Sequence, residues 1–166
     1  MRMRQIVLKV NGVDHEISVL PSDTLADVLH DELGMADVRY GCGEGVCGTC
    51  TVLLDGEPVS GCLTLAVQAA GRQVTTMRGL MGPGDAMHPL QECFLRHGAA
   101  QCGFCTPGMI LTALDLVRRR VRPSRDEIRY ALVGSLCRCT GYTKILDAIE
   151  EYAGQSASEA QKRAPS

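Results

Sequence analysis

The placement of cysteines constrains the fold of this chain more than any other feature of its sequence. Eight of the nine cysteines in the 166 residues fall into two groups of four. The first group has the spacing C-x4-C-x2-C-x11-C, and the second has C-x2-C, a gap of 31 residues, and C-x-C. The members are Cys42, Cys47, Cys50 and Cys62 in the first group, and Cys102, Cys105, Cys137 and Cys139 in the second. The fold must therefore bring each group together, either as disulfides or as ligands of a metal.

Metal ligation is favoured over disulfide bonding. The number of cysteines is odd, and only one residue separates Cys137 from Cys139, so a bridge between them would be strained. Metal-bound thiolates also suit a reducing compartment. The apolar run near the N-terminus stops at Lys9, too early for a signal peptide, and no run reaches the roughly 18 apolar residues of a membrane helix. We therefore expect a cytoplasmic protein with no membrane insertion.

The spacing of the first group is the ligand pattern of a plant-type [2Fe–2S] cluster, which needs four thiolates. Glycines in its loop allow positive φ angles and bring backbone amides close to the sulfurs; they are Gly41, Gly43, Gly45 and Gly48. The second group precedes two predicted helices, whose N-termini favour an anionic cluster and lower thiol pKa values. Zinc is the alternative, mainly for the second group, because two close pairs of cysteines can bind it tetrahedrally. We predict one [2Fe–2S] site at each group.

Residues 1–78 have the pattern of a small α+β domain. The β-rich segments 4–10 and 13–19 are joined by Asn11-Gly12, a strong hairpin signal. Ser22 or Asp23 is expected to cap a helix with one apolar face, formed by Leu25, Val28, Leu29 and Leu33. After the cysteine loop, residues 51–62 predict a strand, an Asp55-Gly56 turn and a short return. A helical turn within 63–70 and a last strand at 73–77 complete the domain.

Residues 79–87 are rich in glycine and proline and are expected to form a linker. Beyond them the apolar period changes from two to 3.6, which predicts helices at 88–97, 107–120, 124–133 and 143–153. Ser124 and Glu127 form a capping box for the third of these. Short connections indicate a four-helix bundle over 88–154. The small, polar residues of 155–166 predict a disordered tail.

The remaining residues indicate no chemistry of their own. The net charge of −2 gives no reason to expect nucleic acid as a partner. The basic run around Arg118, Arg119 and Arg120 is expected to be a solvated helix end, with a docking patch on a larger protein as the alternative. Cys93 lies on an apolar helix face, as buried free cysteines commonly do. No acid–base constellation or nucleotide-binding glycine pattern is present, so no catalytic residue is predicted.

The strings GCGEGVCGTC, QCGFCTPGMI and LCRCTGY strongly resemble those of the iron–sulfur subunits in the xanthine oxidase family of molybdenum hydroxylases. The resemblance covers residues 4–153, and all eight cysteines match in spacing. The members that it resembles most are the small subunits of bacterial three-subunit enzymes, such as carbon monoxide, nicotinate and quinoline dehydrogenases. The strings are specific for this family and say little about the substrate.

The resemblance implies a plant-ferredoxin-like β-grasp domain followed by a four-helix [2Fe–2S] domain. It implies that the second cysteine group holds the cluster nearer a molybdopterin, expected as the cytosine dinucleotide, in a large partner subunit. The first group would hold the cluster nearer FAD in a medium subunit. Gln101 matches a glutamine that hydrogen-bonds the pterin, and Cys139 would lie beside the same pterin edge. The chain would then be the non-catalytic electron-transfer subunit of an oxidoreductase, in a heterotrimer expected to form a dimer of heterotrimers.

Two other functions are compatible with the residues. One is a free-standing two-cluster ferredoxin that serves unrelated partners, although such proteins are usually strongly acidic and a net charge of −2 is weak. The other is a zinc-stabilised interaction module with no redox role.

Overall fold

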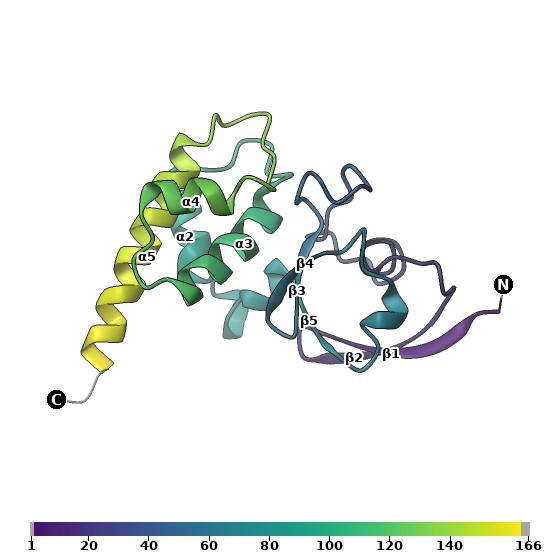
Figure 1. Cartoon of the computed structure of the whole chain (residues 1–166). Helices are drawn as coiled ribbons and strands as arrows, with labels where there is room; N and C mark the ends of the chain where they lie inside the picture. The colour runs from purple at the N-terminus through teal and green to yellow at the C-terminus, as the bar shows by residue number, and fades with distance from the viewer. Residues whose placement is uncertain (1, 164–166) are drawn as a thin grey trace.

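The computed structural model describes the backbone of residues 2–163 and the side chains of residues 2–158. A sheet unit and a helical unit lie side by side (Figure 1). The N-terminus lies at the sheet end, and the last helix, α5 (Thr143–Arg163), lies at the opposite end. The predicted α+β class is confirmed.

The sheet unit contains a five-stranded mixed sheet in the order β2-β1-β5-β3-β4. Its strands are β1 (Arg4–Val10), β2 (Val13–Val19), β3 (Thr51–Leu54), β4 (Glu57–Ser60) and β5 (Gln73–Thr75). β1 runs parallel to β5, and the other pairs are antiparallel. Both predicted hairpins are confirmed, because Asn11-Gly12 and Asp55-Gly56 adopt positive φ angles that match tight two-residue turns.

A short helix covers the apolar face of the sheet. α1 (Leu25–Asp27) continues as the π-helical turn η1 (Val28–Glu32), and Leu25 and Leu29 are fully buried with Leu8 and Val74 of the strands. The predicted helix is confirmed, but the predicted cap is wrong. Thr24 is the N-cap, and its hydroxyl accepts from the Asp27 N–H. Asp23 lies one residue before the cap, and its carboxylate accepts a hydrogen bond from the Leu20 N–H instead.

The helical unit is built from α2 (Pro89–Arg96), α3 (Thr106–Arg119), α4 (Arg125–Ala131) and α5. Their apolar faces enclose one core that includes the fully buried Leu90, Met109, Ile128, Ile145 and Ile149. Cys93 is buried in this core as predicted. The Ser124–Glu127 capping box is present at the start of α4. Among the described residues, no helix has the length and apolar content that crossing a membrane requires.

The segment between the units contains short helical turns and is hydrogen-bonded to the sheet unit, unlike the plain linker that we predicted. Two short 3-10 turns, η3 (Met77–Leu80) and η4 (Pro83–Asp85), lie in or beside residues 79–87. The Arg78 N–H donates to the Asp37 carboxylate at 2.8 Å, which fastens the segment to the sheet unit.

The structure differs from the sequence prediction at the C-terminal end. We predicted that the last helix ends at 153 and that 155–166 is disordered, but α5 continues to Arg163. Gly154 does not break the helix, since Ala157 beyond it is buried and the Gln155 amide donates to Glu151 one turn earlier. The prediction of disorder is therefore wrong for 155–163, and 164–166 lie outside the described residues.

The two units are joined through α3, which packs against β3 and β4. Arg118 and Arg119 near its C-terminus both pair with Glu57 at the start of β4. Arg119 also pairs with Asp115 at 2.9 Å. The prediction of a solvated helix end is confirmed, because the side chains of Arg118 and Arg119 are about half exposed in the last turn of α3. Their pairing with Glu57 additionally links the helical unit to the sheet unit.

Candidate metal centres

The hairpin of β3 and β4 brings half of the first cysteine group together. Cys50 immediately precedes β3 and Cys62 follows β4, and the pairing of Thr51 with Ser60 places them side by side. The Cys62 N–H donates to the Cys50 sulfur at 3.4 Å, and both side chains are buried.

The other half of the first group lies in the preceding loop. The Cys42 sulfur accepts hydrogen bonds from the N–H groups of Glu44 at 3.3 Å and Val46 at 3.4 Å, and the Cys47 side chain lies close enough to lower the pKa of Cys42. The loop thus pairs Cys42 with Cys47 and directs amides at sulfur, which is the environment that an anionic iron–sulfur cluster requires.

Glycine is needed in this loop for conformation and for space. Gly43, Gly45 and Gly48 have φ angles between 66° and 74°, which L side chains rarely adopt. A Cβ on Gly41 would lie 2.9 Å from the Cys47 sulfur. The predicted conformational role of the loop glycines is confirmed at these three positions, and Gly41 leaves room for a ligand sulfur.

The second group also forms two pairs. The sulfurs of Cys102 and Cys139 lie 3.5 Å apart. The Cys105 and Cys137 side chains are close enough to shift each other's pKa, and the Cys137 sulfur accepts from the Thr140 hydroxyl at 3.1 Å. Segments on either side of α3 and α4 thus meet at one point.

The four cysteine pairs, two in each unit, have the arrangement that two [2Fe–2S] clusters need. A [2Fe–2S] cluster divides its four protein ligands between two irons, two on each. Cys42 with Cys47 and Cys50 with Cys62 provide such a division in the sheet unit, and the second group provides the same division in the helical unit. Among the described residues, no three histidine, cysteine, aspartate or glutamate side chains are arranged to share a single metal ion.

The thiols of each group differ in acidity. Hydrogen bonds from the backbone of Glu44, Cys47 and Val46 lower the pKa of Cys42 to about 6. Burial raises the pKa of Cys50 to about 11 and that of Cys105 to about 12. Ligand binding at the buried thiols must therefore release protons.

We predicted that a helix N-terminus lowers the pKa of the second-group thiols, and this prediction is wrong for Cys105. This residue is the N-cap of α3, where the helix dipole favours a thiolate. Its pKa is nevertheless raised, chiefly by burial of the thiol and then by the neighbouring Cys137. The pKa of Cys102 is lowered, chiefly by a hydrogen bond from the Phe104 backbone rather than by a helix.

A backbone hydrogen bond joins the two cysteine groups directly. The Leu136 N–H donates to the Cys47 carbonyl at 2.9 Å, and Cys137 follows Leu136 in the chain. Glycines make this approach possible. A Cβ on Gly48 would lie 2.3 Å from the Gly134 carbonyl, and one on Gly108 would lie 2.1 Å from the Gly48 carbonyl. Sequence reasoning missed this contact, and its only trace in the sequence is glycine at positions 48 and 108.

Each group also exposes one end to the surface. In the helical unit, Cys102 and Cys139 are exposed, and the exposed Gln101 precedes Cys102. The structure therefore brings Cys139 beside Cys102, the residue next to Gln101, and the pterin contact stays a prediction. In the sheet unit, Cys42 is the exposed member of its group.

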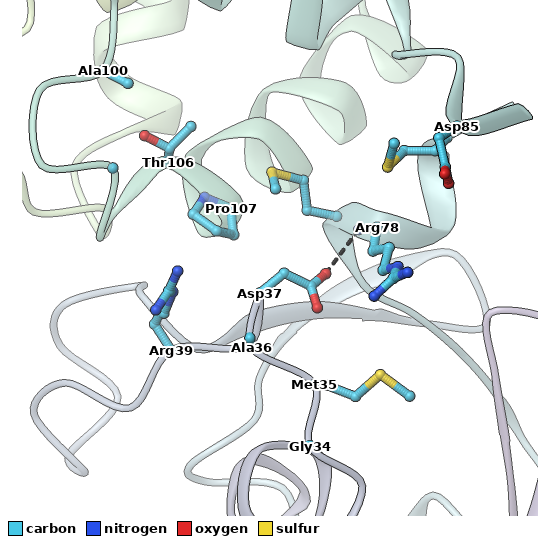
Figure 2. Close-up of a pocket in the computed structure, with 13 residues that line it drawn as sticks. Gly34, Met35, Ala36, Asp37, Arg39, Arg78, Asp85, Ala100, Thr106 and Pro107 are labelled. Carbon is cyan, nitrogen blue, oxygen red and sulfur yellow. Dashed lines mark hydrogen bonds between the residues drawn. The ribbon is translucent and has the colours of Figure 1, made fainter.

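A cavity of about 600 Å³ lies between the units, and its lining includes Gly103 and Thr106, which flank Cys102 and Cys105 in the chain. Figure 2 shows Arg39 of the sheet unit extending toward Thr106 and Pro107 of the helical unit, whereas the Asp37 carboxylate faces the Arg78 backbone. The Arg39 Nε is buried and has no hydrogen-bond partner among the described residues. Sequence reasoning did not anticipate this cavity, because its lining comes from segments that are distant in the chain.

Two family matches cover most of the chain. Residues 8–75 match the 2Fe-2S iron-sulfur cluster binding domain, and residues 76–150 match the [2Fe-2S] binding domain. The matches cover the two cysteine groups separately. The chain therefore contains two [2Fe–2S] binding domains.

Relatives of similar length support the same classification. The chain is 44% identical to the nicotine 6-hydroxylase small subunit of Paenarthrobacter nicotinovorans, over 91% of this chain and 90% of that protein. It is 46% identical to the nicotinate dehydrogenase small FeS subunit of Eubacterium barkeri, over 87% of this chain and 91% of that protein.

Among solved structures, quinoline 2-oxidoreductase from Pseudomonas putida 86 contains a chain that matches with a TM-score of 0.89 and 44% identity. The match covers 98% of this chain and 99% of that chain. The protein therefore belongs to the iron–sulfur small subunits of the xanthine oxidase family of molybdenum hydroxylases.

Proposed function

We propose that this chain is the electron-transfer subunit of a three-subunit molybdenum hydroxylase or dehydrogenase. Its eight paired cysteines hold two [2Fe–2S] clusters, Cys42, Cys47, Cys50 and Cys62 in the sheet unit and Cys102, Cys105, Cys137 and Cys139 in the helical unit. When bound, the clusters supply one-electron redox chemistry. The chain supplies the ligands, the amide donors and the distance between the sites, and it contains no catalytic residue. We also infer that the two units are a ferredoxin-like β-grasp domain and a four-helix domain.

The observation that carries this proposal is the direct connection of the two cysteine groups. The Leu136 N–H donates to the carbonyl of Cys47, and the next residue, Cys137, belongs to the other group. Two metal sites with unrelated structural roles would not need such contact. A short connection of bonded and hydrogen-bonded atoms suits the passage of one electron at a time between the sites.

The exposed end of each site is where a partner's cofactor would approach, and the direction of electron flow follows from the family resemblance. Gln101 and Cys139 lie on the exposed face of the helical unit, where they would contact the pterin of a molybdopterin, expected as the cytosine dinucleotide, in a large subunit. Cys42 is exposed on the sheet unit, where a medium subunit would bring FAD close. Electrons would enter at the helical unit and leave at the sheet unit.

The relatives' names support an assembly with other chains, since two of them are small subunits. We infer a heterotrimer that pairs into a dimer of heterotrimers, in the cytoplasm, where a reducing environment keeps the thiols free for metal. The substrate would be bound by the large subunit.

The experiment that tests the proposal replaces one ligand cysteine and, as a control, one cysteine that belongs to neither group. Cys102→Ser removes a ligand of the helical unit, so its EPR signal should be lost while the plant-type signal of the sheet unit remains. Cys93→Ser is the matched control, because Cys93 is buried in the helical core and outside both groups. It should keep both signals. Simultaneous loss of both signals in the Cys102 variant, or of either in the Cys93 variant, would contradict the assignment.

A further inference from the structure

The backbone at Tyr142 adopts an unusual conformation. Its φ angle is 67°, in the left-handed region that a bulky side chain rarely occupies, and Gly141 before it has a φ angle of 64°. Such a conformation persists only where its surroundings hold it, and it occurs most often at functional sites. The aromatic ring is half-buried and packs against the core of the helical unit.

The hydroxyl group of Tyr142 is hydrogen-bonded on both sides. It accepts from the Cys137 N–H at 2.8 Å and donates to the Ser135 carbonyl at 3.1 Å. A single phenol oxygen thus spans the tripeptide Ser135–Cys137. Neither bond needs a metal, so the arrangement is a property of the polypeptide itself.

The middle residue of this tripeptide makes the connection between the two cysteine groups. Leu136 donates its N–H to the Cys47 carbonyl at 2.9 Å. Its side chain is 51% exposed and does not anchor it in a core. The position of its amide is therefore determined by the backbone on either side, which Tyr142 holds.

We infer that Tyr142 is a positioning residue for electron transfer between the two clusters. Its hydroxyl fixes the Ser135 carbonyl and the Cys137 N–H, and this directs the Leu136 amide at Cys47. With both clusters bound, one electron would pass from the reduced helical-unit cluster to the oxidised sheet-unit cluster, with no covalent bond formed or broken. The inference rests on the proposed function, because it assumes that both groups hold clusters.

The test compares Tyr142→Phe with Tyr130→Phe in the full-length protein, purified together with any partner subunits that bind it. Both changes remove one hydroxyl, but the Tyr130 side chain on α4 is 83% exposed and lies outside the connection. Three readouts are taken: EPR of each cluster, the rate of electron transfer between clusters after rapid one-electron reduction, and amide hydrogen exchange of the peptide that contains Ser135–Cys137.

In Tyr142→Phe, both EPR signals should remain, because all eight cysteines are intact. Exchange in the tripeptide should be about tenfold faster, since a hydrogen bond that protected it is lost. Electron transfer between the clusters should slow several-fold. Tyr130→Phe should match the unsubstituted protein in all three readouts.

Each other result overturns the inference. Unchanged electron transfer in Tyr142→Phe would show that the hydroxyl does not set the connection. Loss of only the helical-unit cluster would show that the hydroxyl holds the ligand Cys137 itself rather than the bridge. If the unsubstituted protein lacked two cluster signals, the proposed function would fail first, and the role of Tyr142 would fail with it.

Discussion

Cysteines in the same group differ sharply in their surroundings. Cys42 is exposed and surrounded by backbone N–H donors, whereas Cys50 is buried next to Cys62 and Ala26. The donors favour the thiolate and the burial favours the protonated thiol. Cys42 is therefore ready to bind metal as a thiolate, whereas Cys50 must first lose a proton.

This difference predicts distinct reactivity in the chain prepared without iron. The pKa of Cys42 is lowered to about 6, so its thiolate predominates at neutral pH, and its alkylation by iodoacetamide should fall only as the pH drops through about 6. Cys50, buried and with its pKa raised to about 11, should be alkylated slowly until the chain unfolds. Peptide mapping by mass spectrometry against pH measures both. A midpoint for Cys42 near the ordinary thiol value of 9.0 would show that its amide donors are not in place.

At the scale of residues, local spacing made the cysteine groups predictable, because ligands of one cluster recur at short, fixed separations. Gln101 was found only through the resemblance, and its pterin contact stays a prediction. Leu136 and Tyr142 could not be found. Their roles depend on backbone hydrogen bonds between the loop at Cys47 and a segment far along the chain, and such bonds leave no residue pattern.

The secondary-structure elements were predictable where a local signal marks them. The Asn11-Gly12 turn and the Ser124 capping box marked their hairpin and helix correctly. The end of α5 was missed because its continuation depends on tertiary packing of Ala157, which sequence periodicity does not report. The contact of α3 with the cysteine loop was missed for the same reason.

That contact yields a prediction about Gly108, the third residue of α3. Alanine is intrinsically favoured over glycine in a helix by about 1 kcal/mol. A Cβ at Gly108, however, would lie 2.1 Å from the Gly48 carbonyl, so the helix and the loop must separate. Gly108→Ala should therefore lower the free energy of unfolding by about 1–3 kcal/mol, as overpacking typically does. Thermal unfolding of the cluster-loaded protein measures the effect as a lower Tm.

The matched control is Gly154→Ala in α5, where a Cβ would have no neighbour within 4 Å. This change should leave the Tm unchanged or raise it, because only the helix preference acts. If Gly108→Ala raised the Tm as well, the close approach of α3 to the cysteine loop would not exist in the protein.

At the scale of the whole molecule, two units with separate cores are held in one relative position. α3 lies against the sheet, Arg118 and Arg119 pair with Glu57, and Leu136 bonds Cys47. Each unit brings together one cysteine group, and the interface brings the groups together. The sequence showed the division into two units through the change in apolar period. It did not show the interface, because residues at an interface between units carry no periodicity of their own.

The central claim is that this chain holds two [2Fe–2S] clusters, and metal analysis of the purified protein tests it most directly. The account predicts about four iron and four acid-labile sulfide ions per chain, as two such clusters require. The same protein should contain no stoichiometric zinc. Zinc in place of iron, or iron and sulfide sufficient for only one cluster in fully loaded protein, would contradict the account.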